Sequence, residues 1–269
     1  MSGSAFYFGI PLLSKQVSPN WELTCSLVSR TVESCLLNED ADVRVVIACH
    51  EVPELKLSSD NLLEKVTFLQ SDTPPPANDA SKMERRQDKH RKMGALVEHA
   101  SKDGSCHLFV LDADDVVSNS IVSHIRSKGN TSIIFRVGYV FNEKTQEIYL
   151  RERFDQFCGS ACALFFGANG KGGTNLDGDG LSKVPMSHKL WQKLIERFGG
   201  AWQKSREPHV VYIKNHGSNL SFLGDDGVFD PSRPLRFEAQ FSEERIEETA
   251  EKVELSEIAK VFPLLRIQR

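Results

Sequence analysis

The stretch that most constrains this chain is HLFVLDADDVV, which occupies residues 107–117. Four apolar residues, 108–111, run directly into the carboxylates of Asp112, Asp114 and Asp115. This pattern predicts a buried strand with acidic side chains at its carboxyl end, where open α/β sheets bind ligands. A divalent cation would relieve the repulsion among these carboxylates. The alternative, a surface turn in which aspartates end the strand and cap the next helix, needs only one of them.

Strands and helices alternate before this stretch. Apolar runs at residues 5–13, 43–49 and 66–69 predict three strands, and apolar residues at helical spacing predict a helix between the first two. This order implies parallel pairing with right-handed crossovers. Ser81 and Glu84 form a capping-box pattern that opens a second helix ending near residue 100. We therefore expect an α/β fold with a mixed, mainly parallel sheet flanked by helices.

The second half of the chain is less regular. Residues 131–141 indicate one strand, and residues 147–150 indicate its antiparallel return in a hairpin. Residues 241–262 carry apolar side chains at helical spacing behind an acidic start, which predicts a peripheral helix. We expect one domain over residues 1–235 and a helical tail over residues 236–269.

Composition limits the partners and the compartment. The net charge of -4 over 269 residues lacks the basic footprint of a nucleic-acid-binding protein. Six cysteines without a CxxC pair indicate reduced, buried thiols, as in a cytoplasmic protein. The first residues resemble a strand rather than a signal peptide, and no segment is apolar enough to span a bilayer. Peripheral contact with the inner face of a membrane is compatible with this composition.

A run of positive charge precedes the acidic stretch. Residues 82–92 contain six lysines and arginines within the predicted second helix. Such a run is commonly a solvated helix face. The functional interpretation is that Lys89 and Lys92, at i and i+3, share a face that points to a diphosphate beside the aspartates.

Together these features resemble the GT-A fold glycosyltransferases, in particular the family 2 glycosyltransferases. The resemblance rests on the order of elements, the DxD motif within LDADD, and a late YxxxHGSNxS at residues 212–221, and it spans residues 5–221. It implies a hexosyltransferase-like enzyme of polysaccharide biosynthesis. Such an enzyme moves a sugar from a UDP-, GDP- or dTDP-sugar to a glycan or lipid-linked acceptor, with Mn²⁺ or Mg²⁺ bridging the diphosphate.

The resemblance also implies roles for individual residues. It places the metal on Asp112, Asp114 and His216. The residues that it places against the nucleotide sugar are Pro11, His50, Glu51, Asp72, Lys89, Lys92, Asp112, Ala113, Gly159 and Ser160.

The chain departs from the family at the general base. Inverting members place an acidic pair at a helix start, and its Asp deprotonates the acceptor hydroxyl. At that point this chain reads VPMSH, residues 184–188. Asp177 and Asp179, in a glycine-rich loop over residues 167–180, and Asp155 are the weak candidates that remain. The base is therefore unassigned, and inversion or retention is open.

Two other functions are compatible with the sequence. LFVLDADDVV also fits the first motif of haloacid-dehalogenase-type phosphatases, in which Asp112 would be the nucleophile and Asp114 a general acid. That motif normally opens its fold, whereas about a hundred residues precede it here. The missing base favours a further alternative, a non-catalytic GT-A domain that binds a nucleotide.

Overall fold

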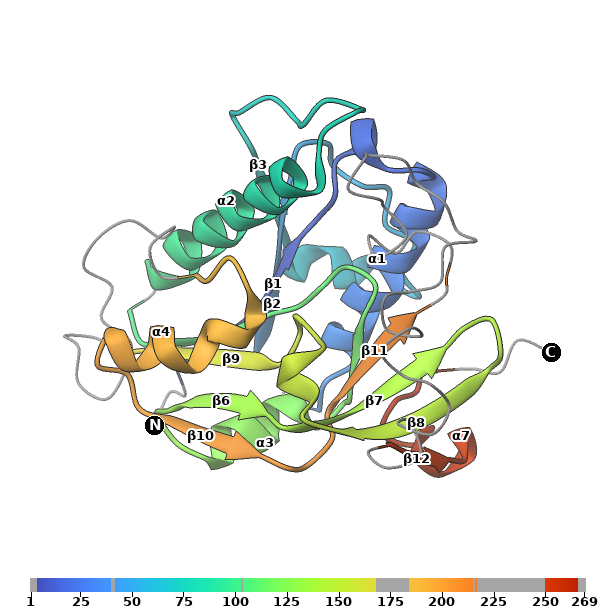
Figure 1. Cartoon of the computed structure of the whole chain (residues 1–269), viewed down its shortest axis with the longest axis vertical. Helices are drawn as coiled ribbons and strands as arrows, with labels where there is room; N and C mark the ends of the chain where they lie inside the picture. The colour runs from blue at the N-terminus through green and yellow to red at the C-terminus, as the bar shows by residue number, and fades with distance from the viewer. Residues whose placement is uncertain are drawn as a thin grey trace.

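The computed structural model describes residues 4–39, 42–102, 104–167, 184–214, 216 and 250–265. Two sheets form the framework of these residues (Figure 1). The larger has the spatial order β10 (Trp202–Ser205), β6 (Ser132–Phe135), β9 (Cys162–Phe166), β4 (Cys106–Val110), β1 (Ala5–Pro11), β2 (Val43–Cys49) and β3 (Val66–Gln70). The smaller has the order β12 (Ala250–Val253), β8 (Glu147–Glu152), β7 (Val137–Asn142), β11 (Val210–Lys214) and β5 (Val116–Val117).

Most neighbours in the larger sheet run in the same direction. β1 lies between β2 and β4 and is parallel to both, and β2 is parallel to β3. β10 is parallel to β6, whereas β9 runs antiparallel to β4 and β6. The predicted α/β fold with a mixed, mainly parallel sheet is therefore confirmed. Because β1 and β4 are parallel neighbours, their carboxyl ends lie side by side at one edge of the sheet.

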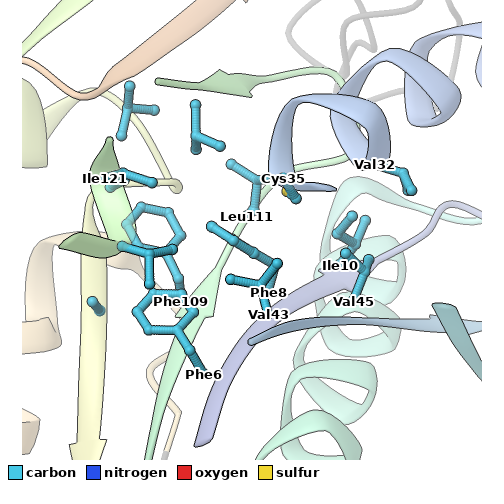
Figure 2. Packing of buried hydrophobic residues seen from close by; sticks show 14 of the residues in the cluster. Phe6, Phe8, Ile10, Val32, Cys35, Val43, Val45, Phe109, Leu111 and Ile121 are labelled. Atoms are coloured by element: carbon cyan, nitrogen blue, oxygen red, sulfur yellow. The ribbon is translucent and has the colours of Figure 1, made fainter. Parts of the chain in front are cut away.

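Helices cover both faces of the larger sheet because its buried strands are apolar on both sides. Phe8 of β1 packs with Val32 and Ile121 in one core (Figure 2). Tyr7, which points to the opposite face, packs with Leu96 in another. Within the described part of the chain, no helix combines the length and apolar composition needed to cross a membrane. The main helices are α1 (Trp21–Leu36), α2 (Lys82–Ser101), α3 (Ile121–Ser127), α4 (Trp191–Arg197) and α7 (Leu255–Ile258).

The capping box at the start of α2 is confirmed. The Ser81 hydroxyl accepts from the Glu84 backbone N–H at 3.3 Å, and the Glu84 carboxylate accepts from the Ser81 backbone N–H at 2.8 Å. These two bonds satisfy backbone donors that the first turn of a helix cannot pair internally. The sequence signal alone therefore located the start of α2.

The single strand predicted over residues 131–141 is wrong, because the chain changes sheets within it. β6 ends at Phe135 in the larger sheet, and β7 begins at Val137 in the smaller one. Arg136 lies between them, and its backbone N–H donates to the Ser205 carbonyl at 2.8 Å. Both pieces are apolar, so the hydrophobic pattern does not reveal the break. The antiparallel return is confirmed, since β7 and β8 pair over six residues each.

The tail is only partly the helix that the sequence predicts. Residues 250–253 form β12, which pairs antiparallel with β8, and the helix α7 covers Leu255–Ile258. Residues 241–249 lie outside the described residues. The edge of β8 offers backbone N–H and C=O groups, and pairing with them outweighs local helix preference. The domain boundary at residue 235 stays a prediction.

Candidate functional site

The acidic stretch lies where the two sheets meet. After β4, the Leu111 backbone N–H donates to the Gly9 carbonyl at 2.9 Å, which keeps the chain beside β1. A turn follows, in which the Asp115 N–H donates to the Asp112 carbonyl at 3.2 Å, and the chain then enters β5 of the smaller sheet. The carboxylates of Asp112 and Asp114 are therefore held on a short turn between two strands, at the predicted edge.

Asp112 forms an ion pair with the basic helix. Lys89 Nζ lies 2.5 Å from Asp112 Oδ1. Burial lowers the pKa of Lys89, but the charges of Asp112, Asp114 and Asp115 outweigh it and raise the pKa overall. The ammonium of Lys89 thus stays charged and neutralises part of the acidic cluster. Lys89 was predicted to lie beside the aspartates, and in the structure it contacts Asp112 directly.

Asp114 contacts the late histidine. His216 Nε2 lies 2.8 Å from Asp114 Oδ2, although the two residues are 102 positions apart in the sequence. The His216 side chain is only 2% exposed, and β11 brings Tyr212 to the same place. Burial and the nearby aspartates raise the pKa of Tyr212, so its phenol stays protonated at neutral pH. A carboxylate and an imidazole are thus available together as metal ligands.

Asp115, by contrast, supports the turn from inside. It is fully buried and accepts from Ser160 Oγ at 2.6 Å, from Ile213 N–H at 3.1 Å and from Cys158 Sγ at 3.3 Å. Burial, followed by the charges of Asp114 and Asp112, raises its pKa. The buried Ser160 hydroxyl also accepts from the Asp112 backbone N–H at 2.8 Å. Ser160 therefore holds the acidic turn in place and does not face the two cavities described below.

Gly159, which the resemblance places against the nucleotide sugar, lies close to Asp112. A Cβ atom at this position would lie 2.7 Å from Asp112 Oδ2, closer than real Cβ contacts. The Asp112 carboxylate therefore lies against bare backbone three residues before β9. Any larger residue at position 159 would displace it.

Two cavities open on either side of the Lys89–Asp112 pair, and they share Arg85, Lys89 and Asp112. The first, of about 200 Å³, is lined by Pro11, Leu12, Leu13, Thr24, Leu27, Arg85, Asp88, Lys89, Asp112, Ala113, Asp114, Tyr212 and His216. The second, of about 380 Å³, is lined by Lys82, Arg85, Arg86, Lys89, His90, Met93, Val110, Asp112, Gly159, Pro185, Met186, Ser187, His188 and Trp191.

The predicted site residues therefore divide into two groups. Seven of them line a cavity, with Lys89 and Asp112 in both cavities, and they are Pro11, Lys89, Asp112, Ala113, Asp114, Gly159 and His216. Ser160 lies beneath the turn. The structure does not bring Lys92 or His50 to either cavity. Lys92 Nζ instead contacts Asp88 Oδ2 and the Leu12 carbonyl, each at 2.7 Å, and His50 Nε2 lies 2.8 Å from Asp88 Oδ1.

The remaining candidates lie away from the cavities or outside the described residues. Glu51 accepts from the Lys15 backbone N–H at 2.8 Å, and Asp72 is exposed on the loop after β3. Asp155 pairs with Arg136 at 3.0 Å and lines neither cavity. Asp177 and Asp179, the other candidate bases, lie outside the described residues. Of the three candidate bases, only Asp155 lies within the described residues, and it is paired with an arginine.

Arg85, Tyr212 and His188 are among the lining residues that were not predicted as site residues. Arg85 is buried and donates to the carbonyls of Val17, Asn78 and Ala80, whereas its place in a charge run indicates a solvated face. Tyr212 had a signal, since it begins the YxxxHGSNxS pattern.

His188 is the third. It ends the VPMSH stretch in which no acidic base was found, and its Nε2 lies 3.1 Å from the Gln156 carbonyl. The tautomer that donates from Nε2 leaves Nδ1 unprotonated. Burial lowers the pKa of His188, so its ring is neutral at pH 7. A neutral imidazole with one fixed nitrogen is a proton acceptor in the second cavity.

Comparisons with known proteins give a distant likeness. No protein-family model and no curated protein matches the sequence. The chain is similar to the structure of S. aureus TarS residues 1–349, with 7% identity and a TM-score of 0.44, covering 78% of this chain and 60% of that one. The same protein in complex with UDP-GlcNAc gives 9% identity and a TM-score of 0.43, covering 81% of this chain and 60% of that one.

Proposed function

We propose that this protein is a glycosyltransferase that moves a sugar from a nucleotide-diphosphate sugar to a hydroxyl acceptor. One observation carries the proposal: Lys89, Asp112, Asp114 and His216, from three separate parts of the chain, converge on cavities at the carboxyl ends of β1 and β4. Positive and negative groups in one cleft suit a diphosphate with a cation. The donor is a UDP-, GDP- or dTDP-sugar, and the acceptor is a glycan or a lipid-linked sugar.

The two cavities suggest how the donor lies. The first is lined by Pro11, Leu12 and Leu27, whose apolar surfaces suit a nucleoside. The shared Lys89 lies at the boundary, where the diphosphate would pass between the cavities. The second, larger cavity then holds the donor sugar and the acceptor beside Gly159 and His188.

The residues present fit a Mn²⁺ or Mg²⁺ ion. Asp112 and Asp114 each keep about a quarter of their side-chain surface exposed, and the latter already contacts His216. These three residues would hold the ion, which neutralises the charge that builds on the departing diphosphate. Lys89 would move from Asp112 toward the phosphate oxygens when the donor binds. The buried Asp115 is not a ligand in this scheme, since three protein donors already occupy its oxygens.

We assign the general base to His188. As the acceptor hydroxyl attacks the anomeric carbon, its proton passes to His188 Nδ1, and the bond to the diphosphate oxygen breaks with its electron pair on the leaving group. The hydrogen bond from Nε2 to the Gln156 carbonyl fixes the ring for this transfer. A base that activates the acceptor directly implies an inverting reaction.

Calorimetry with UDP, GDP and dTDP, with and without Mn²⁺, tests the binding part of the proposal. UDP-GlcNAc, the ligand of the TarS complex, is one member of the donor panel. We expect metal-dependent binding of one nucleotide and its loss in Asp114→Asn. Metal-independent binding of equal strength would show that Lys89 alone neutralises the diphosphate. Failure of every nucleotide to bind, with formation of an aspartyl phosphate from a phosphoester, would favour the phosphatase alternative.

Donor hydrolysis separates an enzyme from a binding domain and tests His188. We expect His188→Gln to reduce kcat by about 10²- to 10⁴-fold with little change in KM for the donor. Glutamine can still donate to the Gln156 carbonyl but cannot take a proton. His90→Gln is the matched variant, because His90 Nε2 also lies 2.8 Å from a carbonyl, that of Val184, in the same cavity. An equal loss in both variants contradicts the assignment, and absence of hydrolysis in the unmodified protein favours a nucleotide-binding domain.

A further inference from the structure

A second cluster of metal-ligating side chains lies at α3 and the loop between β10 and β11. It consists of His124, Glu207 and His209, whose ligand atoms all lie within 4.8 Å of one another. His124 Nδ1 is 3.1 Å and His209 Nε2 is 3.8 Å from the same atom, Glu207 Oε2. Figure 1 shows α3 beside β6 and β10, and none of the three residues lines either cavity of the nucleotide site.

Both rings are held through their other nitrogen. His124 Nε2 lies 2.9 Å from Ser205 Oγ, and His209 Nδ1 lies 2.7 Å from Ser118 Oγ. In the tautomers that donate to these hydroxyls, His124 Nδ1 and His209 Nε2 carry lone pairs that face Glu207. His209 Nε2 is buried and has no hydrogen-bond partner among the described residues. Metal-bound histidines are oriented in this way by an outer hydrogen bond.

Both imidazole rings are in the neutral form, which is the form that binds a metal cation. Their centroids are 4.4 Å apart, and burial lowers the pKa of both, that of His209 to about 4. Two neutral rings therefore face one carboxylate. Lys128 is the nearby cation, with Nζ 3.7 Å from Glu207 Oε1, the oxygen that does not face the rings. Its contact leaves Oε2 available.

We propose that His124, Glu207 and His209 bind a Zn²⁺ ion at a site separate from the aspartates of the nucleotide site. Zinc bonds to imidazole nitrogen and carboxylate oxygen of about 2.0–2.2 Å place tetrahedral ligands about 3.3 Å apart. The observed 3.1 and 3.8 Å lie on either side of this value, and the two ring nitrogens lie within 4.8 Å of each other. Two imidazoles favour Zn²⁺ over Mg²⁺ or Ca²⁺, and the 63% exposed Glu207 side chain leaves an entry path and room for water as the fourth ligand.

The ion would connect elements that lie far apart in the sequence. Ser118 follows β5, and its backbone N–H donates to the His209 carbonyl at 2.9 Å, directly before β11. A metal on His124 and His209 would add a bond between α3 and the start of β11. The inference does not depend on glycosyl transfer, because it concerns residues that take no part in the proposed reaction.

The test is Zn²⁺ titration of the full chain after chelator treatment, followed by calorimetry and thermal unfolding. We expect one Zn²⁺ per chain that is still bound in Asp114→Asn, and a rise in Tm of roughly 5 °C at saturation. Glu207→Gln should weaken Zn²⁺ binding by about tenfold or more and remove the rise in Tm. Glu152→Gln, which removes another exposed, ion-paired carboxylate, should bind Zn²⁺ like the unmodified protein.

Cobalt gives a second readout that does not depend on activity. Co²⁺ at this site should show visible d–d absorption without the near-ultraviolet bands of thiolate ligands, because the six cysteines lie elsewhere and are buried. The proposal is overturned if Zn²⁺ does not bind at micromolar to low millimolar concentrations, or if Glu207→Gln binds it unchanged. It is also overturned if binding is lost in Asp114→Asn but kept in Glu207→Gln, since the ion then occupies the nucleotide site.

Discussion

Lys89 and Gly159 confine the Asp112 carboxylate from opposite sides. The ammonium of Lys89 contacts one oxygen, and the backbone of Gly159 lies against the other. The carboxylate can therefore change partner only by moving away from the glycine. This explains why a residue without a side chain occurs at position 159, just before β9.

We expect Gly159→Ala to abolish nucleotide binding while costing about 1–3 kcal/mol of stability. The new methyl group would lie 2.7 Å from Asp112 Oδ2 and push the carboxylate off its ion pair. Calorimetry and urea unfolding measure the two effects. Gly138→Ala is the matched control, because its Cβ would meet the Phe154 ring at the same 2.7 Å, away from both cavities. Equal nucleotide affinity in the two variants would contradict this account of Gly159.

The buried Asp115 should make stability depend on pH. Its pKa is raised in the folded state, so over a window that opens near pH 4 the folded protein keeps a proton that the unfolded chain has lost. Stability from this group is present below that window and is lost as pH rises through the raised pKa. Asp115→Asn cannot titrate, so its stability relative to the unmodified protein should rise with pH, by up to about 1.4 kcal/mol per pH unit. Urea unfolding from pH 4 to 8 measures the difference, and a constant difference contradicts the prediction.

The helix α2 contains both the lysine that contacts the cleft and a buried ion pair that fixes the helix in place. Lys89 faces Asp112, whereas Asp88, the residue before it, and Lys92, about one turn after it, form a buried pair with 4–6% exposed side chains. His50 of the loop after β2 contacts the same Asp88 carboxylate. The buried pair thus fixes the rotation of α2 and, with it, the direction in which Lys89 points.

Asp88→Ala should destabilise the protein by about 3–5 kcal/mol, because it leaves the Lys92 ammonium buried without its partner. Burial already lowers the pKa of Lys92, while Asp88 acts in the opposite direction. The urea midpoint is the measurement. In the double variant Asp88→Ala/Lys92→Met no unpaired ammonium remains, and part of the loss should be recovered. A double variant less stable than Asp88→Ala would show that the pair is not the reason.

The molecule as a whole shows which features can be predicted from sequence. Buried parallel strands are continuous apolar runs, so β1 to β4 and the acidic turn were located within a few residues. The burial of Arg85 and Lys92 could not be predicted, because their partners include carbonyls of Val17 and Leu12, about seventy to eighty positions earlier. His188 was missed for a related reason: only the fold brings it to the same cavity as Asp112.

The end of the described chain is part of the structure rather than an appendage. Phe262 is 1% exposed and meets Tyr139 of β7 edge to face, with ring centroids 5.7 Å apart. Phe262→Ala should therefore cost about 3–5 kcal/mol. Thermal and urea unfolding measure it, with Val261→Ala as a control at an exposed neighbour. A loss below about 1 kcal/mol would mean that residues 250–265 are held only by strand pairing.

The turn from Asp112 to Asp115 lies in a covalent link between the two sheets at the cleft. Asp112 follows a strand of the larger sheet, while Asp115 accepts from Ile213 in the smaller one. A ligand that spans Asp112 and Asp114 therefore holds both sheets at once. Its binding free energy adds to the work needed to separate them. Ligand binding in the cleft would therefore also stabilise the contact between the two sheets. Backbone amides in both sheets would then exchange hydrogen more slowly when the ligand is bound.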